Sequence, residues 1–247
     1  MAPKIGVQLY SVREQSANDY EGTIRKIVEM GYRYVEPAGY PGSTIAEAAK
    51  IFQRYGLQAL SCHGKLPIGK DKNQAIEEAQ IIGAKYIISG CCPEDFKTVD
   101  KIRAVADIWT KASANATEHG IQVGYHNHDW EMFDVDGRPG YQILMNNTPE
   151  EVLMQVDTYW VFVGGKKPVD IIKEVGPRGK VLHIKDGPGD KTSAMQPLGT
   201  GKMDFPPILE VADYAELLIV ELDSCDIDMM EALKQSYDYL LGIGTPC

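Results

Sequence analysis

The stretch Ile81-Ile82-Gly83-Ala84-Lys85-Tyr86-Ile87-Ile88-Ser89 joins the end of a predicted helix to a predicted strand. Glycine directly after an amphipathic segment is typical of a left-handed helix cap, and an apolar run without alternation is typical of a strand buried on both faces. The same succession recurs at Gly31, Gly56, Gly120 and Gly176. Its repetition predicts that helices alternate with parallel strands along the whole chain.

Eight strands can be placed in this way. They are residues Ile5–Tyr10, Tyr34–Glu36, Leu57–Cys62, Tyr86–Ser89, Ile121–His126, Val152–Asp157, Val181–Ile184 and Leu217–Leu222. The 247 residues then leave about 31 for each strand with its helix and loops, as a βα unit requires. We therefore predict an α/β fold, a (β/α)8 TIM barrel that comprises residues 1–247 as a single domain. A doubly wound sheet is less favoured, because no Gly-rich dinucleotide fingerprint follows the first strand.

The charge of the chain narrows the classes of partner. It has 35 Asp and Glu against 25 Lys and Arg, a net charge of −10, which argues against wrapping nucleic acid. No run approaches the roughly 20 apolar residues of a membrane helix, and Met1-Ala2-Pro3-Lys4 leads into a strand without a signal-peptide pattern. We expect a cytoplasmic protein, although a periplasmic one whose export signal has been removed would look the same.

The predicted strands end on residues that can bind a metal or move a proton. These are Glu36, His63, His126, Asp157, His183 and Glu221. In a parallel barrel the carboxyl ends of all strands open onto one shared mouth, so side chains that are distant in sequence meet there. Buried carboxylates must be paired, protonated or coordinated to a cation. The pattern therefore predicts a polar site at the barrel mouth.

Several motifs in chain order resemble the xylose isomerase-like TIM-barrel superfamily, in particular its sugar phosphate isomerase/epimerase group. They are Gly6–Arg13, His126-Asn127-His128-Asp129-Trp130-Glu131, Val156-Asp157-Thr158, His183-Ile184-Lys185-Asp186, Leu198–Phe205 and Val220–Asp223. The resemblance covers essentially the whole chain. It implies that Glu131, Asp157, His183 and Glu221 hold one divalent metal ion, and oxygen ligands with one imidazole suit Mn²⁺, Co²⁺, Mg²⁺ or Zn²⁺.

Two departures from the family pattern leave parts of the site open. Ketose epimerases usually carry a Glu within strand five, where this chain has His126 and His128 and places Glu131 further on. Either His126 or Glu131 is then the strand-five ligand. Trp160 stands where many relatives have a substrate-binding His, and the His-x-His pattern is similar to the inosose dehydratase and keto-glycoside lyase branches.

The predicted reaction is proton abstraction next to a sugar carbonyl, through an enediolate that the metal stabilises. Glu221 is the expected ligand and base on one face, with His126 or His128 as the acid/base on the other and Glu131 as a further catalytic candidate. Return of the proton gives an isomerase or epimerase, whereas loss of a β-substituent gives a dehydratase or lyase.

The remaining predicted site residues bind substrate, which is expected to be a small-molecule sugar or sugar derivative. His63 and Lys185 are the main candidates; Glu36 and Arg13 are equally able to form rim salt bridges, and Trp160 can stack on a sugar ring. The resemblance also allows a homodimer. Less favoured functions are endonuclease IV-like DNA repair, which needs a basic groove, and a non-catalytic sugar-binding barrel.

The stretch Gly199-Thr200-Gly201-Lys202 is excluded as a phosphate loop. It lacks the four-residue gap between the glycines and the Ser or Thr after Lys, and no strand directly precedes it.

Overall fold

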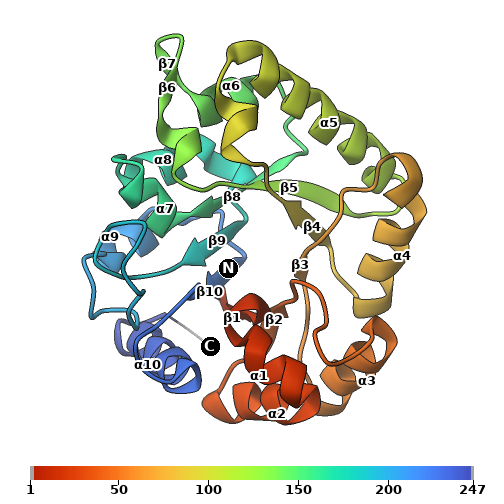
Figure 1. Ribbon diagram of the computed structural model, residues 1–247, viewed down its shortest axis with the longest axis vertical. Helices are drawn as coiled ribbons and strands as arrows, with labels where there is room; N and C mark the ends of the chain where they lie inside the picture. The colour runs from red at the N-terminus through yellow and green to blue at the C-terminus, as the bar shows by residue number, and fades with distance from the viewer. Residues whose placement is uncertain (1–2, 246–247) are drawn as a thin grey trace.

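All eight predicted strands are present in the computed structural model, which describes residues 3–245. They are β1 (Lys4–Gln8), β2 (Tyr34–Glu36), β3 (Ser61–His63), β4 (Tyr86–Ser89), β5 (Gln122–His126), β8 (Leu153–Asp157), β9 (Val181–Ile184) and β10 (Leu217–Val220). They pair in parallel in the order β2-β1-β10-β9-β8-β5-β4-β3 and surround the centre of the molecule (Figure 1). Isolated bridges of Tyr34 with Gln58 and of Ala38 with His63 close the ring between β2 and β3. The predicted (β/α)8 TIM barrel is confirmed.

Helices cover the outside of this ring (Figure 1). They are α1 (Arg13–Asn18), α2 (Tyr20–Met30), α3 (Ile45–Tyr55), α4 (Lys72–Ile82), α5 (Val99–Thr117), α6 (Gly140–Asn146), α7 (Thr158–Val163), α8 (Pro168–Val175), α9 (Phe205–Glu210) and α10 (Met229–Gly242). Short 3₁₀ helices are η1 (Leu9–Val12), η2 (Gly69–Asp71), η3 (Pro93–Phe96), η4 (Trp130–Met132) and η5 (Gly176–Arg178). Within residues 3–245 no helix is both long and apolar enough to cross a membrane.

Local signals set the ends of these helices. At α3, the Thr44 hydroxyl accepts a hydrogen bond from the backbone N–H of Glu47, whose carboxylate accepts one from the backbone N–H of Thr44. This capping box satisfies two backbone donors that the first turn leaves without partners. The helix ends at Gly56, whose φ of 69° lies in the left-handed region that glycine adopts without a Cβ penalty.

Several strand boundaries differ from the prediction, those of the fifth and sixth predicted strands by a single residue. The third predicted strand, residues 57–62, forms a regular ladder only over β3, because its first part reaches β2 through the single bridge at Gln58. The first strand ends at Gln8, whose side chain accepts a hydrogen bond from the backbone N–H of Tyr10 and starts η1. A short hairpin of β6 (Asp134–Val135) and β7 (Arg138–Pro139) was not predicted.

The interior of the barrel changes from apolar to polar along the strands. Toward the amino ends of the strands, the interior is an apolar cluster of Tyr86, Ile88, Leu153, Val181, Leu217 and Ile219. Strand side chains alternate between the two faces, so residues two or four positions later point into the same interior. The side chain of Asp157 therefore points to the same face as that of Leu153, four positions earlier, and His183 points to the same face as Val181, two positions earlier. The apolar cluster forms a floor under a polar site at the carboxyl ends of the strands.

Candidate active site

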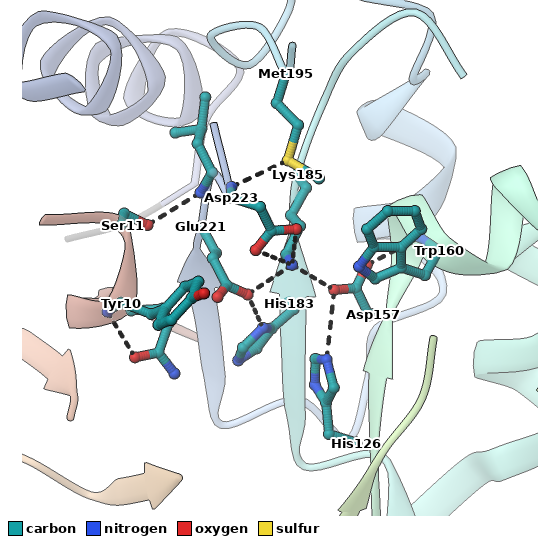
Figure 2. A network of polar contacts seen from close by, with 12 residues as sticks. Tyr10, Ser11, His126, Asp157, Trp160, His183, Lys185, Met195, Glu221 and Asp223 are labelled. Atoms are coloured by element: carbon teal, nitrogen blue, oxygen red, sulfur yellow. Dashed lines mark hydrogen bonds and ion pairs between the residues drawn. The ribbon is translucent and has the colours of Figure 1, made fainter. Parts of the chain in front are cut away.

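Asp157, His183 and Glu221 come together at this end of the barrel (Figure 2). They belong to β8, to β9 and to the residue directly after β10. Each offers one ligand atom, and these atoms all lie within 4.8 Å of one another. All three side chains are buried. Sequence-distant residues therefore form one compact group of nitrogen and oxygen donors.

Lys185 supplies positive charge to this group. Its Nζ lies 2.7 Å from Glu221 Oε2, 3.1 Å from Asp157 Oδ2 and 3.2 Å from Asp223 Oδ2 (Figure 2). Burial opposes the charge of the ammonium, but the three carboxylates outweigh it and raise the pKa of Lys185 well above its ordinary value. Burial likewise opposes the charge of Glu221, yet Lys185 and His183 hold the pKa of that carboxyl well below its usual range. Both groups are ionised at neutral pH.

The group has the chemistry of a divalent-cation site. Asp157 Oδ2 is buried and accepts no hydrogen bond from residues 3–245; its close neighbours are Lys185 Nζ and, at 3.8 Å, His126 Nε2. The Lys185 ammonium offsets part of the cost of burying this carboxylate, and a bound cation would offset more of it at an oxygen that has no hydrogen bond. Two carboxylates and one imidazole are ligands that Mg²⁺, Mn²⁺, Co²⁺ or Zn²⁺ accepts. The residues present therefore fit such an ion.

Glu36 lies beneath this group and orients it. His183 Nδ1 lies 2.7 Å from Glu221 Oε2, and His183 Nε2 lies 2.6 Å from Glu36 Oε1. Burial opposes the charge of His183, but Glu36 and Glu221 outweigh it and raise its pKa to about 10. Glu36 is fully buried and does not line the cavity, so its position is that of a residue behind the site rather than the predicted substrate contact.

A cavity of 340 Å³ opens above the group, within the size range of small-molecule sites. Its lining includes Lys185, Glu221 and Asp223, which we call the carboxylate wall. It also includes His63, His126 and His128, which we call the imidazole wall. Trp160 and Tyr10 line the cavity as well, so His63, Lys185 and Trp160 lie where substrate-binding residues were predicted.

His128 is the free member of the imidazole wall. Its ring stacks on Trp130 with centroids 4.2 Å apart, and its buried Nδ1 has no hydrogen-bond partner within residues 3–245. Burial, followed by the charge of Lys185, lowers the pKa of His128 to about 4. A neutral imidazole with an uncommitted ring can exchange a proton with a ligand in the cavity.

Two predicted site residues lie elsewhere. Glu131, on η4, is fully buried; its carboxylate accepts hydrogen bonds from the Tyr125 hydroxyl at 2.6 Å and the His128 backbone N–H at 2.8 Å. It does not join the group of Asp157, His183 and Glu221. The Arg13 guanidinium donates to the backbone carbonyls of Tyr10 and Asp223, and stacks on the Tyr10 ring instead of lining the cavity.

Sequence analysis missed Gln8, Gln155 and Asp223. The two-residue period of a strand could have found two of them, because Gln155 precedes Asp157 by two positions and Asp223 follows Glu221 by two. Glutamine in a strand carries no chemical signal by itself, so only its neighbours could point to it.

The loop between β9 and α9, residues 185–204, is held by Asp186. Its carboxylate accepts hydrogen bonds from the backbone N–H groups of Gly187, Gly199, Gly201 and Met203, at 2.8 to 3.0 Å. A Cβ on Gly201 would lie 2.1 Å from Asp186 Oδ1, so only glycine fits there. The glycine-rich stretch that was excluded as a phosphate loop thus binds an anion of the protein itself.

Comparison with known proteins agrees with this architecture. The sequence profile of the family described as Xylose isomerase-like TIM barrel matches residues 24–241. No curated protein matches this chain.

Among solved structures, two sugar phosphate isomerase/epimerase proteins from Parabacteroides distasonis ATCC 8503 are similar. One is 26% identical with a TM-score of 0.83, over 97% of this chain and 98% of that one. The other is 23% identical with a TM-score of 0.81, over 97% and 94%. A probable 3-DHS dehydratase from Bacillus anthracis is 15% identical with a TM-score of 0.76, over 96% and 98%. The last two likenesses speak for the fold alone.

Proposed function

Because this chain belongs to the xylose isomerase-like TIM barrel family, we propose that it is a divalent-metal-dependent sugar isomerase or epimerase. The observation that carries the proposal is the convergence of Asp157, His183 and Glu221 within 4.8 Å beneath a cavity at the barrel mouth. The name of the Parabacteroides relative that is 26% identical supports the substrate class.

Asp157, His183 and Glu221 would hold the metal. A divalent ion bound there supplies Lewis acidity for negative charge that develops on a substrate carbonyl oxygen. The Lys185 ammonium lies among the same carboxylates and can donate a hydrogen bond to a substrate oxygen. The negative charge that develops when a proton leaves the carbon would therefore be stabilised by the metal ion and by the Lys185 ammonium.

The two walls of the cavity provide two groups for proton transfer. Glu221 is ionised on the carboxylate wall and can accept the proton next to the carbonyl. The neutral ring of His128, whose buried Nδ1 has no hydrogen-bond partner within residues 3–245, lies on the imidazole wall and can exchange a proton with the substrate. Trp160 offers an aromatic face for the apolar side of a sugar ring.

A keto-sugar dehydratase or lyase is the second candidate. The specific observation in its favour is that Glu131 is bonded elsewhere and does not line the cavity, which leaves imidazoles as the acid/base groups beside the carboxylate wall. Elimination needs a base at the α-carbon and an acid at the leaving group, and His128 suits the second role.

Solvent isotope exchange separates these candidates. The purified protein would be incubated with Mn²⁺, Co²⁺, Mg²⁺ or Zn²⁺ and a panel of free and phosphorylated keto-sugars in ²H₂O. Deuterium on the carbon next to the carbonyl of an intact sugar supports the isomerase or epimerase, whereas an unsaturated product that has lost a β-substituent supports the lyase. Metal-independent activity, binding without turnover, or cleavage of nicked DNA in a parallel assay would contradict the proposal.

A further inference from the structure

The Glu36 carboxylate fixes the orientation of a neighbouring amide. Glu36 accepts hydrogen bonds from Gln8 Nε2 at 2.8 Å, from His183 Nε2 at 2.6 Å and from Gln155 Nε2 at 2.9 Å. An ionised carboxylate only accepts hydrogen bonds, so the amide of Gln155 must turn its NH₂ group toward Glu36. Its Oε1 then points the other way.

This oxygen fixes the tautomers of two histidines. Gln155 Oε1 lies 2.8 Å from His63 Nε2 and 2.8 Å from His126 Nδ1. A carboxamide oxygen also only accepts, so both ring nitrogens carry a hydrogen. His63, His126 and His183 form a second group whose ligand atoms lie within 4.8 Å. Gln155 and Glu36 engage nitrogens of all three as donors, which argues against a metal in that group.

His126 is left with one free lone pair. In a neutral imidazole with Nδ1–H, the other nitrogen, Nε2, is the acceptor. His126 Nε2 lies 3.8 Å from Asp157 Oδ2, the oxygen without a hydrogen bond (Figure 2). Two atoms bound to one ion at about 2.1 Å each lie roughly 3 to 4 Å apart, and this pair fits that span. His126 lies outside the group whose ligand atoms are all within 4.8 Å of one another, so its ring has to shift toward Glu221 when an ion binds.

We propose that His126 supplies, through Nε2, the fourth ligand of the site formed by Asp157, His183 and Glu221, and that Gln155 is the positioning residue that presents it. The inference rests on the proposed metal site and names the strand-five ligand that the sequence left open. Glu131 is then free for its hydrogen bonds with Tyr125 and with the backbone N–H of His128.

The ligand set can be counted by NMR. The full chain would be labelled with ¹⁵N-histidine and titrated with ¹¹³Cd²⁺, whose one-bond couplings mark coordinating nitrogens among the five histidines. We expect two coupled nitrogens, Nδ1 of His183 and Nε2 of His126. His126→Gln should remove one coupling, whereas the control His128→Gln should keep both.

The other outcomes separate two failures. Bound cadmium with coupling to His183 alone, or with coupling to His63, overturns the assignment of His126 while the metal site stands. Absence of bound cadmium overturns the proposed metal site and the inference together.

A second variant tests the positioning role of Gln155. Gln155→Met removes the acceptor of His126 Nδ1–H, and we expect a 10- to 100-fold loss of Cd²⁺ affinity with a mixed His126 tautomer in the ¹⁵N shifts. The matched control is Gln8→Met, which also takes a donor from Glu36 but has no hydrogen bond to His126 within residues 3–245. If His126 in the wild-type chain carries its hydrogen on Nε2, or stays fully Nδ1–H in Gln155→Met, the inference is wrong.

Discussion

Lys185 and Asp186 are neighbours in the chain, but their side chains serve two different regions of the molecule. Lys185 points into the cavity, where its ammonium lies among the side-chain carboxylates of three residues. Asp186 points away from the cavity and accepts hydrogen bonds from four backbone N–H groups of the β9–α9 loop. Two neighbouring residues can therefore have different roles, Lys185 in the cavity and Asp186 in holding the loop, because consecutive side chains along an extended strand point to opposite faces.

The largest expected effect is the loss of the loop anchor. In Asp186→Ala, four backbone N–H groups lose a charged acceptor, and such hydrogen bonds contribute about 1.5–3 kcal/mol each without full additivity. We expect a loss of about 4 kcal/mol in the free energy of unfolding, measured by urea denaturation. Asp190→Ala, an exposed cap in the same loop, is the control and should change stability little. A loss below about 1 kcal/mol for Asp186→Ala would contradict its anchoring role.

Removal of the Lys185 ammonium is predicted to reduce activity. In Lys185→Gln the cavity loses its buried ammonium, and we expect kcat/KM on the sugar identified by the isotope assay to fall about 10²- to 10³-fold. Lys191→Gln is the matched control, because Lys191 lies in the β9–α9 loop, pairs with Asp129 and does not line the cavity. Less than a threefold change for Lys185→Gln would remove Lys185 from the catalytic site.

Another buried acid, Glu131, sharpens the comparison because its carboxylate accepts two hydrogen bonds, from the Tyr125 hydroxyl and the His128 backbone N–H. Burial raises its pKa to about 7 from an ordinary 4.5. The unfolded chain therefore ionises first as the pH rises, and stability falls between pH 4.5 and 7. Glu131→Gln lacks this titration, so the amount by which the wild type is more stable than the variant should shrink by about 3 kcal/mol across the window.

Urea denaturation at several pH values measures this difference in stability. The exposed Glu150→Gln serves as the control and should show a constant difference from the wild type. A stability advantage of the wild type over Glu131→Gln that grows with pH would have the wrong sign.

The smallest expected effect concerns the aromatic part of the cavity. Trp160 lines the cavity, and Lys185 Nζ lies 5.8 Å from the centre of its ring. Trp160→Leu should raise KM about five-fold with little change in kcat, equivalent to about 1 kcal/mol of ground-state binding. Phe133→Leu, an exposed aromatic outside the cavity lining, is the steady-state control. A large fall in kcat with unchanged KM would instead place Trp160 at the reacting atoms.

The sequence was sufficient for the fold and for the residues at the strand ends. Gly83 before Tyr86–Ser89 repeats along the chain, and such local signals fix where strands begin. Asp157 and His183 were found because parallel strands deliver their last residues to one mouth. The strand period also places His126 and His128 on the same wall, as expected.

The sequence was insufficient where the chain leaves regular structure. Glu131 lies on the 3₁₀ turn η4, so no strand period fixes the direction of its side chain. Glu36 is at a strand end, but whether it faces ligand or lies beneath the site depends on Gln8, Gln155 and His183, which reach it from three other strands. Such a hydrogen-bond network is a property of the closed barrel and cannot be read from spacing along the chain.

The joint between β2 and β3 is the weakest strand pairing that the structure describes in the barrel. Isolated bridges at Gln58 and His63 replace the continuous ladder found around the rest of the ring, so we expect the backbone amides there to exchange with solvent sooner than those of β8, β9 and β10. Glu36 and His63 lie on either side of this joint and meet at 3.1 Å. Local opening of the ring at this joint would therefore reach the hydrogen-bond network under the cavity first, and would reach Glu221 only through His183.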